Sequence, residues 1–176
     1  MEAKARYTID DLIELERKHF GRRAKPDASG KPILVLPDMA HSMARGEIIF
    51  LLKTWLNGGT LPGYMVGPSL THCIDGWLCE PDVCIAREKG APYPECAPLL
   101  AVEVHSVDNT WREMRAKAAR YLEYGSAMVW LVDPRQQTLE LHQPDAAPQM
   151  LAGDDVIDGG ATLPGFRAAV NDVFPD

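Results

Sequence analysis

Apolar residues recur at the three-to-four-residue spacing of an amphipathic helix in three parts of the chain. The first part spans residues 8–19, where Thr8 and Asp11 have the spacing of an N-terminal capping pair. The second spans residues 40–57 and the third residues 109–124, and each stops at glycine. The pattern therefore predicts three helices, one at the start of the chain and two in its body.

Between these helices the pattern changes to short apolar runs separated by turn residues, which is typical of β-strands. The order of elements predicts an α/β fold, in which a mixed β-sheet core is flanked by helices. We expect a single domain over residues 1–176, with an N-terminal helix and loop at 1–32, a core at 33–143 and a C-terminal strand, loop and short helix at 144–176. The predicted strands are 33–36, 64–66, 78–86, 99–105, 128–132 and 138–142; loops are expected at 21–31, 88–98 and 154–164, and a short helix at 167–173.

The composition is that of a globular domain with an acidic balance. Of 176 residues, 46% are hydrophobic and 24% are charged, and the net charge is −7. No apolar run approaches the ~18 residues of a membrane span, and residues 1–6 lack the apolar stretch of a signal peptide, so we expect a cytoplasmic protein without membrane contact. The acidic balance argues against holding nucleic acid by bulk charge, but it is compatible with a nuclease whose carboxylates bind a cation. One basic cluster either follows a phosphate backbone or forms a solvated surface: Arg17, Lys18, His19, Arg22, Arg23 and Lys25.

Two apolar strands contain carboxylates that such strands ordinarily lack. Alternation along the strands places Asp82 with Cys84, and Glu103 with His105, on faces opposite the valine and isoleucine positions. A carboxylate buried in a sheet is costly unless something compensates its charge, and two at neighbouring strand ends repel each other. A divalent cation resolves both problems, and hard oxygen ligands with room for water suit Mg²⁺ or Mn²⁺. Alternatively, the two carboxylates are solvated at strand ends or paired with nearby arginines.

The third predicted helix carries charged residues on one face and apolar residues on another. Glu113 and Lys117 share the charged face with Arg120 and Tyr124. A lysine that points at the metal could orient or deprotonate the attacking water and offset negative charge on the phosphate. In the plainer interpretation, Glu113 and Lys117 form a surface ion pair, and Thr110 with Glu113 caps the helix.

The four cysteines indicate a different chemistry. In an intracellular chain we expect free thiols, and the spacing does not reproduce the paired C-x-x-C pattern of a zinc ribbon. A zinc site of less usual form remains an alternative. Its ligands would come from His72, His105, Cys73, Cys79, Cys84 and Cys96.

Several short motifs follow one another in a characteristic order. They are Pro81-Asp82-Val83, then Val102-Glu103-Val104 with Ser106, then Lys117, Tyr121 and Gly125, and then Val129-Trp130-Leu131-Val132-Asp133-Pro134. In this order and spacing they resemble the Uma-two family of endonucleases, which belongs to the PD-(D/E)-x-K nuclease superfamily. The opening helix from Tyr7 to Leu15 and the closing motif Leu163-Pro164-Gly165-Phe166 extend the resemblance over most of the chain.

This resemblance implies a restriction-endonuclease-like core, and it assigns roles in the site to particular residues of this chain. Asp82 and Glu103 would bind the metal, and Lys117 would be the catalytic lysine, carried here by the helix. Most of the superfamily places that lysine two residues after the glutamate, where this chain has His105. His105 is then either a metal-proximal base or a polar residue at a strand end.

Three further residues match positions that the family or superfamily often uses. Glu113 stands where the family often has an aspartate, and it would support the site. Glu47 matches a glutamate that the superfamily often adds from the preceding helix, or else it is an exposed helix charge. His41 matches a family histidine, and its role is left open.

The expected function is a Mg²⁺-dependent endonuclease, with Mn²⁺ as the other suitable ion, that hydrolyses phosphodiester bonds in DNA by in-line attack of water. Exposed strand edges and the apolar strand at 128–132 favour a homodimer. Two alternatives remain open. One is a catalytically inactive nuclease-like module for nucleic-acid binding or assembly, which the acidic charge favours, and the other is the zinc protein.

Overall fold

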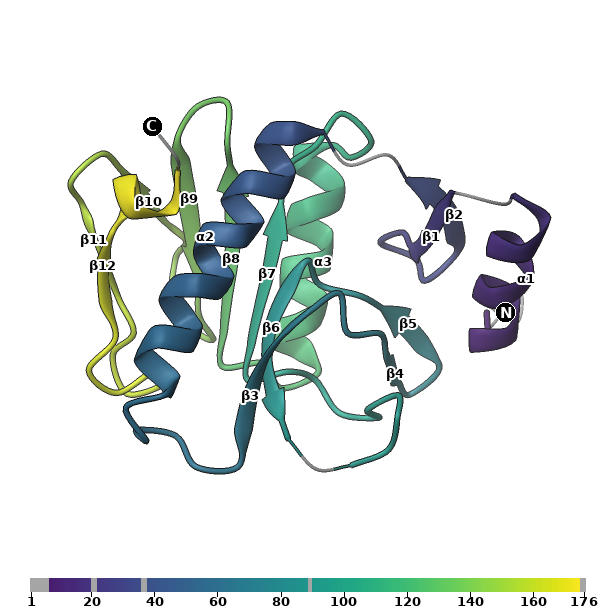
Figure 1. Cartoon of the computed structure of the whole chain (residues 1–176), viewed down its shortest axis with the longest axis horizontal. Coiled ribbons are helices and arrows are strands. Elements are labelled where there is room, and N and C mark those ends of the chain that lie inside the picture. The colour runs from purple at the N-terminus through teal and green to yellow at the C-terminus, as the bar shows by residue number, and fades with distance from the viewer. Residues whose placement is uncertain (1–6, 20–21, 36–37, 89, 175–176) are drawn as a thin grey trace.

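A six-stranded mixed β-sheet forms the centre of the molecule, as the computed structural model in Figure 1 shows. The structure describes residues 7–19, 22–35, 38–88 and 90–174. The strand order is β10-β9-β8-β7-β6-β3, in which β7 and β8 are parallel and the other neighbours are antiparallel. The predicted fold class, a mixed sheet flanked by helices, is confirmed. The strands are β3 (Tyr64–Pro68), β6 (Val83–Arg87), β7 (Leu100–Val104), β8 (Met128–Asp133), β9 (Thr138–His142) and β10 (Gln149–Ala152).

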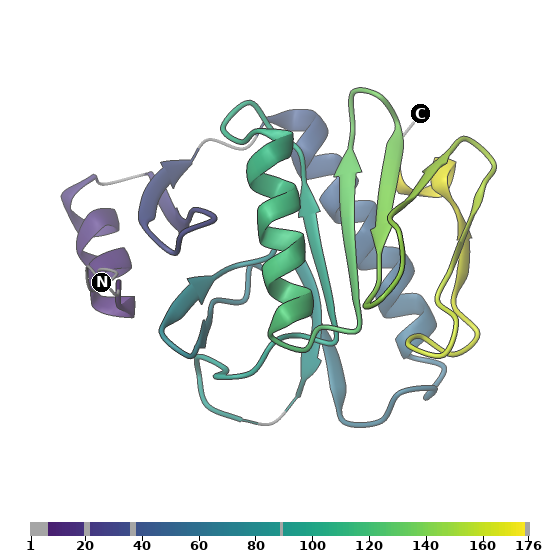
Figure 2. The ribbon, with the colours of Figure 1, turned by 180° about the vertical axis from the view of Figure 1, so that it is seen from behind.

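Two helices cover opposite faces of this sheet, α2 (Met39–Leu56) on one and α3 (Trp111–Glu123) on the other (Figures 1 and 2). Helix α3 is the crossover that a parallel pair of strands requires, because β7 and β8 run in the same direction. Alternate side chains of each strand enter the two cores. On β7, Val102 and Val104 pack on the α2 side, whereas Ala101 packs against α3. Burial on both faces explains why these strands read as apolar runs.

An N-terminal unit lies beside the sheet and consists of α1 (Ile9–Lys18) and a hairpin of β1 (Arg23–Pro26) and β2 (Pro32–Val35). The predicted capping pair is confirmed, because Thr8 and Asp11 form a reciprocal capping box. The prediction of a loop at 21–31 is wrong for β1, whose short polar sequence pairs with β2 across a turn. Strand β2 matches the predicted strand at 33–36 except for residue 36, which lies outside the described residues.

The hairpin packs against a second one, formed by β4 (His72–Ile74) and β5 (Trp77–Cys79). Gly30 at the turn of the first hairpin has a φ of +93°, and a Cβ there would lie 3.3 Å from the backbone of Leu78. The predicted strand at 78–86 is in fact two strands, β5 and β6. They separate at Glu80-Pro81-Asp82, because proline has no N–H to donate to a sheet.

The C-terminal segment also departs from its prediction. The expected loop at 154–164 contains β11 (Val156–Asp158), and the expected helix at 167–173 is β12 (Arg167–Ala169) followed by the 3₁₀ turn η1 (Val170–Val173). Pairing of β11 with β12 places Ile157 and Ala168 in the core on the α2 side. Pairing between strands thus overrides the local pattern. Among the described residues, none of the helices has the length and apolarity that crossing a membrane requires.

Candidate functional site

Asp82 and Glu103 lie next to each other at the ends of two neighbouring strands. The antiparallel register pairs Val83 with Val102, which places Asp82 opposite Glu103 one step further on. The backbone N–H of Val104 donates a 2.8 Å hydrogen bond to Asp82 Oδ2, so the aspartate is held against β7. Both residues are buried, with whole-residue exposed fractions of 3% and 0%. The convergence of two carboxylates that strand alternation predicts is therefore present.

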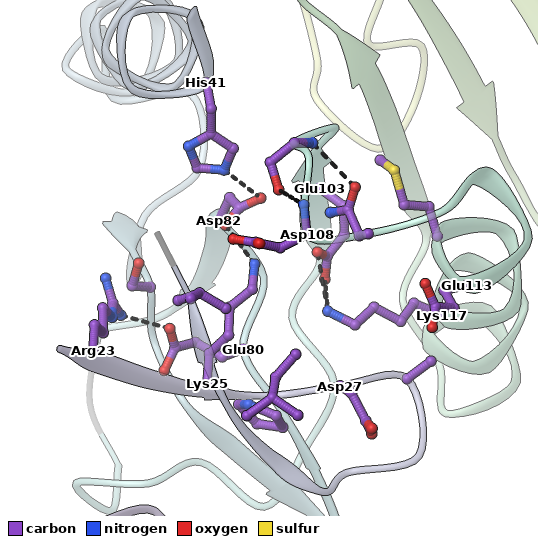
Figure 3. A pocket seen from close by; sticks show the side chains of 18 of the residues that line it. Arg23, Lys25, Asp27, His41, Glu80, Asp82, Glu103, Asp108, Glu113 and Lys117 are labelled. Carbon is purple, nitrogen blue, oxygen red and sulfur yellow. Dashed lines mark hydrogen bonds and ion pairs between the residues drawn. The ribbon is translucent and has the colours of Figure 1, made fainter. Parts of the chain in front are cut away.

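Helix α3 holds Glu103 in place through Lys117, as Figure 3 shows. Lys117 Nζ lies 3.1 Å from both carboxylate oxygens of Glu103, and the hydroxyl of Tyr121 donates to Oε1 at 3.0 Å. Lys117 and Tyr121 are one helical turn apart, so they project from the same face of α3. Because Lys117 is itself buried, this is an ion pair within the protein rather than a surface pair. The structure thus brings the predicted lysine to the predicted glutamate.

The β1–β2 hairpin supplies two more cations. Lys25 Nζ lies 3.1 Å from Asp82 Oδ1, and Arg23 Nη2 lies 2.5 Å from Glu80 Oε1. Figure 3 shows both basic side chains pointing from the hairpin toward the segment that joins β5 to β6. Arg23 and Lys25 are two residues apart on β1, and so are the two acids that they meet. The basic pair and the acidic pair therefore match in spacing.

Helix α2 contributes the residues on the remaining side. His41 is buried, and its Nε2 lies 3.2 Å from Asp82 Oδ2, which gives the histidine left open by the sequence a contact. Its Nδ1 is buried without a hydrogen-bond partner among the described residues. Arg45, one turn further along α2, also lines the site. Among the described residues the guanidinium of Arg45 has no ion-pair or hydrogen-bond partner.

The surroundings of Asp82 and Lys25 keep both side chains charged, and those of Tyr121 keep its hydroxyl protonated. Burial alone would raise the pKa of Asp82, but Lys25, His41 and the Val104 N–H together hold that pKa well below its usual range. Burial alone would lower the pKa of Lys25, but the charges of Asp82 and Glu103 raise it above its ordinary value. Burial also raises the pKa of the Tyr121 hydroxyl, and the charge of Glu103 adds to the increase. The phenol therefore remains a hydrogen-bond donor to Glu103.

Except for Tyr121, these side chains line one pocket of about 710 Å³, a volume that includes its part open to solvent. Asp82 and Glu103 offer hard oxygen donors of the kind that Mg²⁺ prefers, and Mg²⁺ typically takes only one or two protein carboxylates and completes its shell with water and phosphate oxygens. Among the described residues, no three His, Cys, Asp or Glu side chains have the arrangement of a metal site. The donor pair therefore fits Mg²⁺ or Mn²⁺ only with water and substrate as further ligands.

The supporting residues expected from the sequence are placed differently from one another. Glu113 lines the pocket, and its carboxylate caps α3 by accepting hydrogen bonds from the N–H and hydroxyl of Thr110. His105 does not line the pocket; its ring stacks on Trp111, with the ring centroids 5.2 Å apart. Glu47 does not line the pocket either. Geometry thus joins Asp82, Glu103, Lys117 and Glu113 in one site and leaves His105 and Glu47 outside it.

The ligands of the alternative zinc site do not converge. Cys79 is buried near Tyr121, Cys84 is buried near Gly67 of β3, and Cys96 is exposed. His72 Nδ1 lies 2.8 Å from the carbonyl oxygen of Cys96 rather than from a thiol. Burial raises the pKa of the Cys84 thiol to about 12, which makes it a poor metal ligand. The described residues therefore do not form the zinc cluster.

Sequence reasoning placed Arg23 and Lys25 only in a basic cluster that follows a phosphate backbone or forms a solvated surface, whereas both pair with acids of the site. It gave no role to Arg45 or Glu80. A signal for Arg23 and Lys25 was present, because they alternate with Ala24 in the way that places both on one side of a strand. That signal was hidden because the segment was predicted to be a loop. Nothing in the local pattern around Arg45 distinguishes it from an exposed helix charge.

Comparison with known proteins first defines the class of fold. A crystal structure titled as that of "a putative nuclease belonging to DUF820 from Anabaena variabilis ATCC 29413" matches with a TM-score of 0.73. The two chains are 19% identical, and the match covers 82% of this chain and 86% of that chain. The chain therefore has the fold of that nuclease-like protein.

The sequence then defines the family. Residues 12–171 match the Uma2 (Uma-two) family, which is described as "Putative restriction endonuclease". The chain therefore belongs to the Uma2 family, as its motifs predicted, and the family and the fold together support a nuclease. No curated protein matches the chain.

Proposed function

We propose that this protein is a Mg²⁺-dependent endonuclease that hydrolyses phosphodiester bonds in DNA at the pocket between β6, β7 and α3. The observation that carries the proposal is the pair of buried carboxylates, Asp82 and Glu103, at adjacent strand ends with the ammonium of Lys117 beside them. Family and fold point in the same direction. Mn²⁺ is the other ion that this donor set suits.

Asp82 and Glu103 are the residues that would hold the ion. A bound Mg²⁺ would polarise a phosphoryl oxygen and make a neighbouring water more acidic. The chain has already oriented both carboxylates, Asp82 through Val104 N–H and His41, and Glu103 through Tyr121. Such preorganisation avoids the cost of ordering the ligands during the reaction.

Lys117 would act on the substrate from beside Glu103. Its ammonium projects from the rigid helix α3 into a site from which much of the solvent is excluded, so its charge is only weakly screened. It would offset the negative charge that develops on the phosphate as the bond to the leaving oxygen breaks. Arg45, whose guanidinium has no partner among the described residues, would bind a phosphate oxygen of the DNA backbone.

A cleavage assay on plasmid DNA with Mg²⁺ or Mn²⁺ tests the proposal. Asp82→Asn and Lys117→Met are expected to lower the rate by at least about 100-fold, the usual loss when a positioned charge is removed from a hydrolytic site. Glu123→Gln, on the exposed side of α3, is the matched control and should cleave like the wild type. Removal of divalent ions with EDTA should stop cleavage. Equal activity in all four proteins would reject the assignment.

One observation favours the second candidate function, a catalytically inactive module that binds nucleic acid. Each candidate ligand already forms an ion pair within the protein, Asp82 with Lys25 and Glu103 with Lys117, so the site is neutralised without a metal. If the wild type binds a DNA duplex but neither cleaves it nor takes up Mn²⁺ in calorimetry, the module is the correct interpretation. Uptake of Mn²⁺ that Asp82→Asn abolishes would support the enzyme.

A further inference from the structure

We propose that Lys25 is an internal counter-ion that a divalent cation must displace from Asp82, and that it thereby sets the metal affinity of the site. This inference rests on the proposed function, because it takes Asp82 and Glu103 as the metal ligands. It concerns a residue of the β1–β2 hairpin, outside the sheet and helix that carry the predicted site residues.

The contacts of Asp82 divide into two kinds. Oδ2 accepts from the backbone N–H of Val104 at 2.8 Å and lies 3.2 Å from His41 Nε2, and both partners belong to the central sheet and its covering helix. Oδ1 accepts only from Lys25 Nζ, at 3.1 Å, among the described residues. Lys25 therefore occupies the carboxylate oxygen that the rest of the fold leaves for another cation.

An ammonium and a divalent cation repel each other when both contact the same carboxylate oxygen. Their repulsion at contact distance is large in a site where Asp82 and Lys25 are only 4% and 14% exposed. A lysine is well suited to yield, because its charge lies at the end of a flexible four-carbon stem. Lys25 can thus swing away by rotation about its side-chain bonds.

The rest of the hairpin has its own anchor. Arg23 remains paired with Glu80 at 2.5 Å, and the turn of the hairpin packs against β5 at Gly30. Displacement of Lys25 therefore does not require the hairpin to unfold or leave. Lys117 differs from Lys25 because it is buried on α3 and holds both oxygens of Glu103, which makes it part of the fixed site.

Two consequences follow for metal binding. Without metal, Lys25 neutralises a buried carboxylate that would otherwise be costly to keep ionised. With metal, the contact between Lys25 and Asp82 has to be broken, and its free energy is subtracted from that of metal binding. The site therefore binds a divalent cation more weakly than it would without Lys25.

Calorimetric titration of the full chain with Mn²⁺ tests this. Lys25→Met should bind Mn²⁺ at least about tenfold more tightly than the wild type, which corresponds to about 1.4 kcal/mol. Lys25→Arg, which keeps the positive charge, should bind no more tightly than the wild type. Lys31→Met removes one charge from the same hairpin at an exposed position outside the pocket, and it should leave the affinity unchanged.

The results separate the two proposals. Mn²⁺ affinity in Lys25→Met equal to or weaker than that of the wild type overturns the role of Lys25 and leaves the endonuclease proposal standing. An equal gain in Lys31→Met also overturns it, because the effect would then be one of net charge. Absence of Mn²⁺ binding in every variant overturns both proposals.

A second readout needs no variant of Lys25. Reductive methylation followed by mass spectrometry measures how accessible each lysine is, and Lys25 of the metal-free protein should react slowly because Asp82 holds it. Saturation with Mn²⁺ should increase its methylation rate several-fold, while the exposed Lys31 and Lys53 should not change. Methylation of Lys25 that Mn²⁺ leaves unchanged or slows contradicts the displacement.

Discussion

Glu103 is fully buried, so two neighbouring side chains take the place of water around its carboxylate. Lys117 compensates the charge and Tyr121 donates a hydrogen bond, both from α3. A hydrogen bond to a buried charged group contributes about 1.5–3 kcal/mol. At the scale of single residues, two side chains on one face of α3 therefore fix the orientation of the Glu103 carboxylate.

Tyr121→Phe should therefore lower the free energy of unfolding by about 1.5–3 kcal/mol, because it leaves Glu103 with one donor fewer. It should also slow DNA cleavage, since Glu103 becomes less well oriented. Tyr124→Phe makes the same chemical change at a ring that stacks on Trp77 and should have little effect on either quantity. Urea denaturation of the two variants measures the difference, and equal stability losses would contradict the role given to Tyr121.

The residues that sequence reasoning found differ physically from those that it missed. Asp82 and Glu103 stood out because each interrupts an apolar strand, where an ionised group requires compensation. Lys25 and Arg45 lie in segments where charged residues are ordinary, so only the packing of the hairpin and of α2 against the strand ends reveals them. Local sequence thus shows a charge that is out of place, but it does not show which partner meets it.

At the scale of elements, α3 is the support of the site, and its start is held by a capping box between Thr110 and Glu113. Thr110→Ala should lower the free energy of unfolding by about 1 kcal/mol, because the N-terminal N–H groups of the helix lose an acceptor. Glu113→Gln should preserve both stability and cleavage, since glutamine also forms a capping box. Loss of cleavage in a stable Glu113→Gln protein would show instead that the carboxylate acts in the reaction.

The far side of α3 is tied to β9 by a buried acid. Glu140 accepts hydrogen bonds from Arg115, and His142 Nε2 lies 3.1 Å from it. The hydrogen bond from Arg115 lowers the pKa of Glu140 from its ordinary 4.5, against the opposing effect of burial. A lowered pKa in the folded state stabilises the protein above the unfolded value and ceases to do so as the pH falls through the folded value.

Glu140→Gln should therefore destabilise the protein at pH 7, and the difference from the wild type should shrink as the pH falls below 4.5. Chemical denaturation at a series of pH values measures both free energies. A difference that stays constant down to pH 3 would contradict the contribution of this carboxylate.

Element prediction succeeded where one local pattern dominates. The three main helices and the strands at the centre of the sheet have strong periodicity or long apolar runs, and they lie close to their predicted positions. Strands β1, β4 and β11 are only three or four residues long, and they form because a partner strand is nearby in space. Such pairing depends on the whole fold, so the local sequence does not show it.

At the scale of the whole molecule, the site lies where the N-terminal unit meets one end of the central sheet (Figures 1 and 3). Cations from three separate elements converge there in a chain whose net charge is −7. Binding of DNA would therefore rest on a local arrangement of positive charge. The expected homodimer stays a prediction.

Arg45→Met should weaken binding of a DNA duplex, because it removes the one pocket cation that has no partner among the described residues. The slope of log affinity against log salt concentration should fall by about 0.9, the value for one phosphate contact. Lys53→Met on the exposed side of α2 is the control. An unchanged salt dependence for Arg45→Met would contradict a phosphate contact at this residue.

The central claim is that Asp82 and Glu103 together bind a divalent cation, and anomalous diffraction from crystals soaked in Mn²⁺ tests it most directly. We expect one strong anomalous peak within bonding distance of both carboxylates, with Lys25 moved away from Asp82. The contradicting result is a soaked crystal without a peak between these two residues, in which Lys25 keeps its contact with Asp82.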